Sequence, residues 1–315
     1  MTKGGRKKVM IVGLGSIGRR HARIFRDELG CEVAAMRSLG SGNGLGVTEL
    51  RSWKEAGVFS PDVCVITNPT SQHVVTALKC AELGAHLFIE KPLSDGMSGI
   101  KQLKEVCRRK RLACYVAYPL RFHPVVLKAR ELLAKARPLY ARAVCASFLP
   151  DWRPGRDAKS VYSARRKEGG GVILDLSHEF DYLAYLLGPV RKISGAKGRL
   201  ADVTVDAEDY ADASLVFADG TRASVHLDYF SRTVQRDFHI DLEDGFIRGD
   251  LVANTLRCLR DKRERKFSFK VERDDYFVAQ ARYFLGNISN GQGMNSLAEA
   301  VPLLQRILEF RHGRV

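Results

Sequence analysis

A short apolar run near the start of the chain leads directly into a glycine-rich turn, and this stretch constrains the fold more than any other. Residues 9–12 read Val-Met-Ile-Val, which is typical of a strand buried on both faces of a parallel sheet. Gly13, Gly15 and Gly18 then form the pattern G-x-G-x-x-G. In a strand-to-helix turn, Gly13 permits the tight turn, Gly15 leaves room for a pyrophosphate, and Gly18 lets the helix pack closely on the strand.

The helix expected over residues 17–29 supplies the second half of this site. The free N–H groups at its start, on Ser16 and Ile17, and the positive end of its dipole favour a bound phosphate. The glycine pattern also occurs in ordinary turns, so the motif alone is weak evidence. The strand before it and the helix after it favour a dinucleotide site.

The end of the second strand, expected over residues 32–36, indicates which dinucleotide is bound. A fold specific for NAD places Asp or Glu there to hold the ribose 2′-hydroxyl. This chain has Arg37 followed by Ser38, and a guanidinium with a hydroxyl suits a 2′-phosphate. The sequence therefore predicts that NADP(H) is preferred and that NAD(H) is possible. The alternative is that Arg37 simply faces solvent.

The next strand, expected over residues 62–67, ends in a turn that is also predicted to line the cofactor site. A glycine-rich loop over residues 38–47 and a short helix over 49–56 are expected before it. The strand leads into Asn68-Pro69-Thr70, with His73 one turn into the following helix. Ligands in open α/β sheets bind beyond the carboxyl ends of the strands, so Asn68, Pro69 and His73 are predicted to contact the cofactor.

A second anchor, Glu90-Lys91-Pro92, follows the strand expected over residues 86–89. A lysine at the carboxyl end of a strand, beside a bound nicotinamide, can hydrogen-bond a substrate oxygen and lend it positive charge. Pro92 fixes the turn and is compatible with a cis peptide bond. A lysine before proline is more often part of a surface turn, but the position of Lys91 in this fold favours a functional role.

Length, charge and cysteine usage bound the class of protein. The chain has 315 residues, enough for two domains, and 51 basic against 36 acidic residues give a formal charge of +15. This excess favours an anionic partner, such as a phosphorylated cofactor or an acidic sugar, although part of it is a solvated surface. No nucleic-acid recognition motif is apparent, so nucleic acid is not expected as a partner.

The cellular location of the protein and its metal content are predicted from the absence of membrane, signal and metal-binding patterns in the sequence. No apolar run reaches the length of a membrane span and no signal peptide is recognised, so a cytoplasmic protein without membrane contact is expected. The seven cysteines are scattered without C-x-x-C spacing, and neither a zinc site nor a disulfide framework is expected. No metal is predicted.

Taken together, these motifs resemble the glucose-fructose oxidoreductase, inositol dehydrogenase and rhizopine catabolism (Gfo/Idh/MocA) family. The resemblance rests on the glycine loop, Asn68-Pro69-Thr70, Glu90-Lys91-Pro92, the turn over residues 118–124 and the Gly-Gly-Gly-Val-Ile-Leu-Asp run over residues 169–175. It covers nearly the whole chain. It implies an α/β protein, with a Rossmann dinucleotide-binding domain over residues 1–120 and, over residues 121–315, a substrate-binding and oligomerisation domain with a large, mainly antiparallel open sheet.

The resemblance also implies a catalytic trio. The family's lysine falls on Lys91 and its aspartate on Asp175, while its histidine normally lies four residues after the aspartate. Here that position is Glu179, and His178 is one residue earlier. Three- and four-residue steps share one helical face, so spacing does not exclude Glu179, but His178 is favoured because one deletion aligns the rest of the helix. Glu90 and Arg121 are further expected at the cofactor and Tyr118 at the substrate.

The loop over residues 151–157 is the predicted substrate-recognition segment. Trp152 offers a flat face for a sugar ring, and Arg153 and Arg156 can pair with carboxylate or phosphate. Tyr162 follows shortly after. The alternative is a flexible surface loop with solvated charges. Beyond it, alternating segments over residues 210–217, 222–229, 238–242 and 245–250 predict strands, and residues 278–288 and 296–310 predict helices.

The leading hypothesis is an NAD(P)-dependent oxidoreductase that acts on a hydroxyl or carbonyl carbon of an anionic sugar, cyclitol or nucleotide sugar. The family implies a homodimer or homotetramer built through the second-domain sheet. Two alternatives stay open: a non-catalytic, cofactor-binding transcriptional regulator of the same fold, and an enzyme that keeps its cofactor tightly bound and couples two sugar reactions.

Overall fold

The computed structural model describes residues 6–37, 44–155, 157–290 and 293–313, and the chain divides into two compact units. The first unit comprises Met1–Tyr118 and Asp274–Val301, and the second comprises Pro119–Arg273 and Pro302–Val315. The expected border at residue 120 lies next to the observed one. The segment 274–301 departs from the prediction, because it packs with the first unit rather than with the second.

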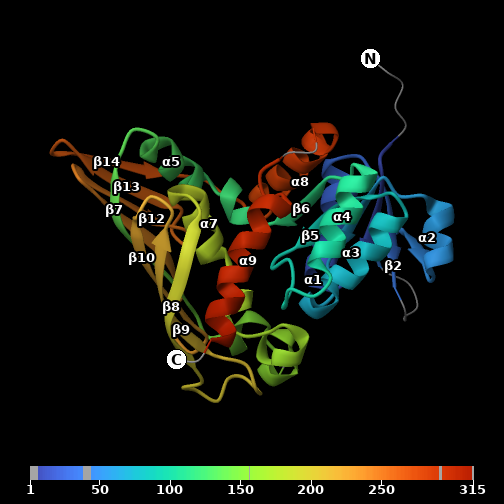
Figure 1. Cartoon of the computed structure of the whole chain (residues 1–315), viewed down its shortest axis with the longest axis horizontal. Helices are drawn as coiled ribbons and strands as arrows, with labels where there is room; N and C mark the ends of the chain where they lie inside the picture. The colour runs from blue at the N-terminus through green and yellow to red at the C-terminus, as the bar shows by residue number, and fades with distance from the viewer. Residues whose placement is uncertain (1–5, 38–43, 156, 291–292, 314–315) are drawn as a thin grey trace. The chain divides into compact units, whose positions relative to one another are not determined.

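In the described part of the first unit, six strands form one parallel sheet in the order β3-β2-β1-β4-β5-β6 (Figure 1). The apolar run becomes β1 (Lys8–Val12), which is buried from Val9 to Val12. Of its neighbours, β4 (Val63–Ile66) is fully buried and β2 (Glu32–Met36) is buried over its three central residues, as expected of strands covered on both faces. The remaining strands are β3 (Thr48–Leu50), β5 (His86–Glu90) and β6 (Cys114–Ala117). The Rossmann topology is therefore confirmed.

Four helices alternate with these strands along the described part of the chain. They are α1 (Ser16–Arg23), which continues as a π-helical turn to Glu28, α2 (Trp53–Phe59), α3 (His73–Glu82) and α4 (Ile100–Lys110). The helix expected over residues 49–56 is wrong in its first half, because residues 48–50 pair with β2 as β3. Ser52 accepts the N–H of Glu55 and so caps α2 only afterwards.

A cluster of rings explains why the segment after residue 273 belongs to the first unit. Helix α8 (Asp275–Asn287) places Phe277 against His21, and Phe284 against Phe88 and Tyr115, with ring centroids 5.4–6.0 Å apart. Such tilted and edge-on ring pairs stabilise a core beyond the area they bury. Because these contacts join residues 169 to 256 positions apart, short-range sequence patterns do not predict them.

In the described part of the second unit, eight strands form one sheet in the order β14-β13-β12-β11-β7-β10-β9-β8. Neighbouring strands are antiparallel except β7 and β10, which are parallel. The four predicted strands are found as β9 (Tyr210–Phe217), β10 (Arg222–Asp228), β11 (Gln235–Leu242) and β12 (Gly245–Asp250). The prediction missed β7 (Pro138–Ala146), β8 (Val190–Gly198), β13 (Thr255–Arg260) and β14 (Arg263–Ser268).

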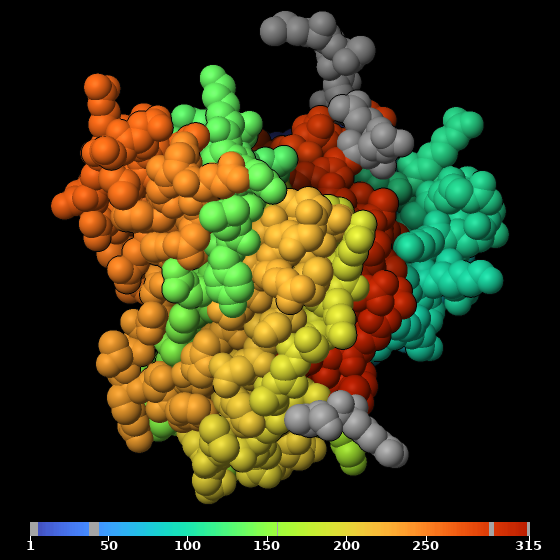
Figure 2. Space-filling model, turned by 60° about the vertical axis from the view of Figure 1, so that its left-hand side comes forward, coloured from blue at the N-terminus to red at the C-terminus, as the bar shows by residue number. Residues whose placement is uncertain are grey.

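This sheet has one covered and one open face, and the alternation along β7 shows which is which. Ala141, Ala143 and Cys145 are buried, whereas Tyr140 and Arg142 are exposed on the other side. The helices on the covered face are α7 (His178–Leu187), which packs on β7, α5 (Pro124–Leu133), which packs on β12 and β13, and α6 (Val172–Asp175), which packs on β9 and β10. Figure 2 shows the open face, with β7 in green between the yellow and orange strands. A mainly antiparallel, one-sided sheet is thereby confirmed.

The chain ends with α9 (Leu297–His312), close to the predicted range of 296–310. In the second unit its last turn is fixed by Arg311, whose guanidinium donates to the carbonyl oxygen of Gly170 and contacts the carboxylate of Glu208. Arg311 and Glu208 are both buried. The ion pair therefore ties the end of the chain to the glycine triplet that precedes α6.

His123 controls the start of α5 and makes the stability of the second unit depend on pH. Its Nδ1 accepts the backbone N–H of Val125, and its Nε2 lies 3.1 Å from the side-chain oxygen of Asn254. This arrangement requires the neutral ring, and burial lowers the pKa of His123 from 6.5 to about 4. The unfolded chain therefore binds a proton between pH 6.5 and 4 that the folded protein does not.

We expect the free energy of unfolding of the second unit to decrease as pH falls from 6.5 to 4, by on the order of 3 kcal/mol from His123 alone. The variant His123→Asn keeps a side-chain cap without a titrating ring, so it should lose this part of the pH dependence. Urea unfolding of both proteins at pH 7.5 and 4.5 measures the difference. Equal pH dependence in the two proteins would contradict the assignment.

Candidate active site

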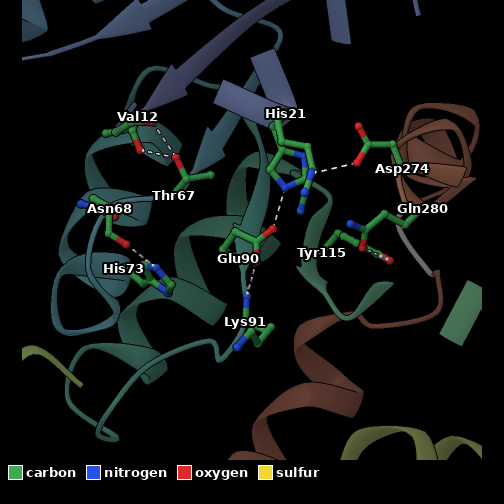
Figure 3. A network of polar contacts seen from close by, with 12 residues as sticks. Val12, His21, Thr67, Asn68, His73, Glu90, Lys91, Tyr115, Asp274 and Gln280 are labelled. Carbon is green, nitrogen blue, oxygen red and sulfur yellow. Dashed lines mark hydrogen bonds and ion pairs between the residues drawn. The ribbon is translucent and has the colours of Figure 1, made fainter. Parts of the chain in front are cut away.

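The turn after β1 has the close packing that the glycine pattern requires. A side-chain carbon on Gly18 would lie 2.1 Å from the carbonyl oxygen of Gly13 and 2.7 Å from Thr67 Oγ1. Thr67 donates to the carbonyl oxygens of Val12 and Gly13 at 3.1 and 2.7 Å, as Figure 3 shows. Gly13 has φ +97° and lies against the backbone of Asn68. The turn is thus held between the carboxyl ends of β1 and β4, where the strand order reverses.

Gly15 and the start of α1 present an open surface that fits a pyrophosphate. A side-chain carbon on Gly15 would meet nothing within 4 Å, and both Gly15 and Ser16 are exposed. The first hydrogen bond of the helix runs from the N–H of Arg19 to Gly15, and the first turn contains no acidic residue. The N–H groups of Ser16, Ile17 and Gly18 therefore precede the helical hydrogen bonds and can donate to phosphate oxygens.

Arg37 follows β2 as predicted, but the structure provides a neighbour that the sequence analysis did not consider. Its Nη1 lies 3.3 Å from Oε1 of Glu49, and both side chains are about four-fifths buried. Glu49 belongs to β3, the strand that the sequence analysis assigned to a helix. A guanidinium and a carboxylate are therefore both present near the end of β2. Ser38 lies outside the described residues.

The turn after β4 is fixed by His73. Its Nε2 lies 2.9 Å from the carbonyl oxygen of Asn68 and its Nδ1 2.9 Å from that of Pro92. The ring is buried, and burial lowers the pKa of His73. His73, predicted to contact the cofactor, thus joins the turns after β4 and β5. Pro69 is exposed beside it.

Asn68 offers an acceptor at this edge of the sheet. Its amide nitrogen donates to Thr76 Oγ1 at 2.8 Å and to Gln72 Oε1 at 3.3 Å. Its Oδ1 is buried and meets no hydrogen-bond donor among the described residues. A buried acceptor without a donor is costly, so this atom fits a ligand that brings an N–H group.

The turn after β5 carries the predicted catalytic lysine. Lys91 is partly exposed, and the Lys91–Pro92 peptide bond is cis. Glu90 is buried and contacts Nε2 of His21 at 2.6 Å, while its second oxygen accepts the backbone N–H of Lys91 at 3.3 Å (Figure 3). The carboxylate of Glu90, predicted to bind cofactor, therefore contacts protein groups on both sides.

In the second unit, Asp175 is the centre of a hydroxyl cluster. Its carboxylate accepts hydrogen bonds from Tyr162 at 2.6 Å, Ser163 at 2.7 Å and Tyr229 at 3.1 Å. Burial and the charge of Asp175 raise the pKa of both tyrosines, so they remain donors at neutral pH. Three donors stabilise the carboxylate anion and fix its orientation. Sequence reasoning missed Ser163 and Tyr229, because only the fold places them beside Asp175.

The structure separates the two candidates for the family histidine. Glu179 is fully buried and makes a bidentate contact with Arg236, at 2.7 and 3.1 Å. His178 begins α7 directly after the short turn that follows Asp175, and its side chain is partly exposed. Glu179 is therefore occupied by an internal ion pair, which favours His178 for contact with a ligand.

Three of the predicted substrate residues lie around the Asp175 cluster. The ring of Trp152 packs edge-on against Tyr229, with centroids 5.4 Å apart, and its Nε1 donates to Ser147 at 2.9 Å. The guanidinium of Arg153 lies 5.9 Å from the centre of the Tyr162 ring. Because Tyr229 and Tyr162 both donate to Asp175, these residues form one connected group. Arg156 lies outside the described residues.

Two further predicted residues are buried and engaged elsewhere. Arg121 makes a bidentate ion pair with Asp181, at 2.8 and 2.9 Å, and its guanidinium is stacked on Tyr185. Arg121 is only 4% exposed. This residue was predicted to bind the cofactor, but in the structure its guanidinium is paired with Asp181 inside the protein. Tyr118 is also 4% exposed, at the end of the first unit.

A cavity of about 1060 Å³ in the first unit lies away from these residues. Its lining comes from α4, α8 and the start of α9, and includes Lys104, Arg108, Arg111 and Tyr283. None of the predicted site residues lines it. Across the described ranges, no cluster of three or more His, Cys, Asp or Glu side chains could hold a metal ion. In the same ranges, no helix has the length and apolar character needed to cross a membrane.

Comparison with known proteins agrees with this architecture. Residues 7–118 match the model of an oxidoreductase family with an NAD-binding Rossmann fold, and residues 126–248 match the GFO/IDH/MocA C-terminal domain. The chain is 26% identical to scyllo-inositol 2-dehydrogenase (NAD(+)) of Bacillus subtilis, over 78% of this chain and 73% of that protein. It is 24% identical to myo-inositol 2-dehydrogenase of Thermotoga maritima, over 90% and 89%.

Solved structures show the same fold. UDP-N-acetylglucosamine 3-dehydrogenase from Acidithiobacillus ferrooxidans superposes with a TM-score of 0.82 at 21% identity, over 98% of this chain and 97% of that chain. Levoglucosan dehydrogenase in complex with NADH gives a TM-score of 0.86 at 18% identity, with the same coverage. The two domain matches together span most of the sequence, and the chain therefore belongs to the GFO/IDH/MocA oxidoreductase family, with an NAD-binding Rossmann domain followed by the family's C-terminal domain.

Proposed function

We propose that the protein is an NAD(P)-dependent dehydrogenase or reductase that transfers a hydride to or from a hydroxyl or carbonyl carbon of a sugar, cyclitol or nucleotide sugar. The observation that carries this proposal is that a chain of this oxidoreductase family has a lysine directly after β5, an aspartate at the end of α6 and a histidine at the start of α7. Relatives are named for inositols, levoglucosan and UDP-N-acetylglucosamine. The retained groups favour catalysis over a purely regulatory, cofactor-binding role.

The roles of the three groups follow from the chemistry of a carbinol. The nicotinamide, when bound, supplies the hydride chemistry. Removal of a hydride from carbon makes the attached oxygen more acidic, so a base must take its proton and a positive group must stabilise the developing charge. We assign proton transfer to His178 and polarisation of the oxygen to Lys91.

Asp175 is assigned an orienting role rather than the role of base. Its carboxylate already accepts hydrogen bonds from Tyr162, Ser163 and Tyr229. Accepting three donors stabilises the charged form and weakens a carboxylate as a base. The same hydrogen bonds fix the orientation of the anion, three residues before His178, and we assign to it the stabilisation of the protonated imidazole that the reaction forms.

An anionic substrate is supported by the side chains around this cluster. Trp152 is 39% exposed and offers a ring face, and Arg153 lies over Tyr162 at the same cluster. An aromatic face and a guanidinium suit a sugar ring that bears a carboxylate or phosphate. The formal charge of +15 adds long-range attraction for such a molecule.

The preference for NADP(H) over NAD(H) is proposed to depend on Arg37 and its neighbour Glu49. The guanidinium favours a 2′-phosphate, whereas the carboxylate favours a 2′-hydroxyl and repels the phosphate. Because Glu49 lies 3.3 Å from Arg37, it competes with the phosphate for the same guanidinium. In this proposal the protein binds NADP(H) more tightly than NAD(H), and Glu49 reduces the difference in affinity.

The open face of the second-unit sheet is proposed to bind a second copy of the chain, in the cytoplasm, where the cofactor is available. Ion pairs on this face, such as Arg142 with Asp241 and His226 with Asp212, neutralise charge across neighbouring strands. Light scattering should give at least twice the mass of one chain. Ser214 is exposed on β9, so Ser214→Glu adds a charge to this face and should shift the protein toward the monomer. A wild-type monomer would contradict the proposal.

Fluorescence titration at fixed salt tests the cofactor assignment. Wild-type protein should bind NADPH more tightly than NADH. Arg37→Ala should weaken NADPH binding about tenfold or more and leave NADH nearly unchanged, because it removes one charge-assisted contact. Glu49→Gln should strengthen NADPH binding, because it frees the guanidinium and removes repulsion. Tighter NADH binding by the wild type would contradict the preference, and no binding of either would contradict the proposed function.

Steady-state kinetics on a panel of acidic and nucleotide-linked sugars test the catalytic roles. Lys91→Met and His178→Gln should each lower kcat by about 10²–10⁴-fold, with cofactor affinity and melting temperature nearly unchanged. Glu179→Gln is the matched comparison for His178. It leaves Arg236 without its buried partner, so it should lower the free energy of unfolding by about 3–5 kcal/mol.

The outcomes of this panel separate the candidates. If Glu179→Gln folds normally and loses turnover while His178→Gln does not, the assignment of His178 is wrong. A Lys91→Met variant with wild-type turnover would remove the proposed role of the lysine. Cofactor that copurifies at one per chain and reacts with two sugars in turn would indicate the enzyme with a tightly bound cofactor.

A further inference from the structure

A buried histidine contacts the residue that precedes the proposed catalytic lysine. His21, on α1, has no exposed surface, and its Nε2 lies 2.6 Å from Oε1 of Glu90 (Figure 3). Glu90 is itself only 7% exposed. The two side chains come from the first helix and the fifth strand, 69 residues apart in sequence. The pair is therefore an arrangement built by the fold, and neither residue is a surface group.

The surroundings of the ring determine how it is protonated. The rings of Phe88, Phe277 and Phe25 lie around His21, with centroids 5.1, 6.0 and 6.4 Å away. Its Nδ1 is buried and meets no hydrogen-bond partner among the described residues. A proton on Nδ1 would be a buried donor without an acceptor, which is costly. The geometry therefore favours a proton on Nε2, which faces the carboxylate of Glu90 and can donate to it.

Glu90 connects His21 to the backbone of Lys91. One carboxylate oxygen accepts from His21, and the other accepts the backbone N–H of Lys91 at 3.3 Å. The carboxylate is thus held between a side-chain donor and the peptide that carries the lysine. Without the imidazole, one oxygen of a buried carboxylate would lose its donor, and the nearest cation in sequence is the ammonium of Lys91.

We propose that His21 is a positioning residue, whose imidazole holds Glu90 on the backbone of Lys91 and keeps this carboxylate from capturing the Lys91 ammonium. The carboxylate of Glu90 then does not compete with the substrate oxygen for the lysine side chain. The inference rests on the proposed function, because the catalytic role of Lys91 is itself part of that proposal. His21 touches neither substrate nor cofactor in this scheme.

Four variants of the full chain test the proposal. His21→Leu removes the donor and keeps an apolar side chain of moderate size. His21→Gln keeps an N–H group that can reach Glu90. Glu90→Gln removes the charge that His21 is said to hold. Phe25→Leu is the matched control, because it disturbs the same ring cluster without removing a donor.

Two readouts are measured on each protein. The first is hydrogen–deuterium exchange of the Lys91 backbone amide, resolved by fragmentation mass spectrometry without cofactor or substrate. The second is kcat on the best substrate of the sugar panel, with the cofactor dissociation constant measured separately. The first reports on positioning whether or not a substrate has been found, and the second reports on its consequence for turnover.

In His21→Leu, we expect the Lys91 amide to exchange about tenfold faster and kcat to fall about 10–100-fold, with cofactor affinity unchanged. His21→Gln should recover most of both quantities, and Phe25→Leu should lower the melting temperature without changing either. Because His21 acts through Glu90, His21→Leu combined with Glu90→Gln should have a kcat no lower than the worse single variant.

Other results would overturn the inference. Unchanged amide exchange in His21→Leu shows that the ring does not hold Lys91, whatever the activity. Loss of kcat that Phe25→Leu reproduces, or that adds fully to the effect of Glu90→Gln, shows a general packing effect. If the wild type turns over no sugar, the proposed function fails, whereas faster exchange in His21→Leu alone would still support the positioning contact.

Discussion

The contact between Gly18 and the turn after β1 determines the geometry of the first unit. The absence of a side chain at Gly18 lets α1 approach the carbonyl oxygen of Gly13, and Thr67 binds that carbonyl from β4. This approach aims the helix start at the place where the strand order reverses. It also fixes the rest of α1, so that one helix presents amides to a phosphate at its start and brings His21 to Glu90 farther along.

Buried ion pairs have a corresponding role in the second unit. Glu179 with Arg236, Asp181 with Arg121 and Glu208 with Arg311 each connect a helix or turn to a distant segment. Breaking such a pair leaves an uncompensated buried charge, which is strongly destabilising, although an intact pair adds little net stability. These pairs therefore specify how the helices lie on the sheet.

The sequence was sufficient to predict those features that depend only on neighbouring residues in the chain. The turn around Gly13, the Lys91 turn and the strands with clear alternation depend on a few consecutive residues, and they were predicted. Long-range contacts were not. Residues 48–50 resemble the start of a helix until β2 is beside them, and that pairing brings Glu49 to Arg37. An arginine such as Arg121 could bind an anionic ligand, but only the fold shows that its guanidinium is paired with Asp181. Likewise, no pattern in the chain links Ser163 or Tyr229 to Asp175.

The order in which the chain visits its two units has a consequence for synthesis on the ribosome. The first unit takes residues 1–118 and then 274–301, so the second unit interrupts it. Until α8 has emerged, Phe88 and Tyr115 lack Phe284, and His21 lacks Phe277. The nascent dinucleotide domain thus exposes part of its ring cluster while about 155 further residues are translated, a delay of roughly 10–30 s at ordinary elongation rates. Chaperone demand during expression should therefore be greatest in that interval, before the late helix covers the rings.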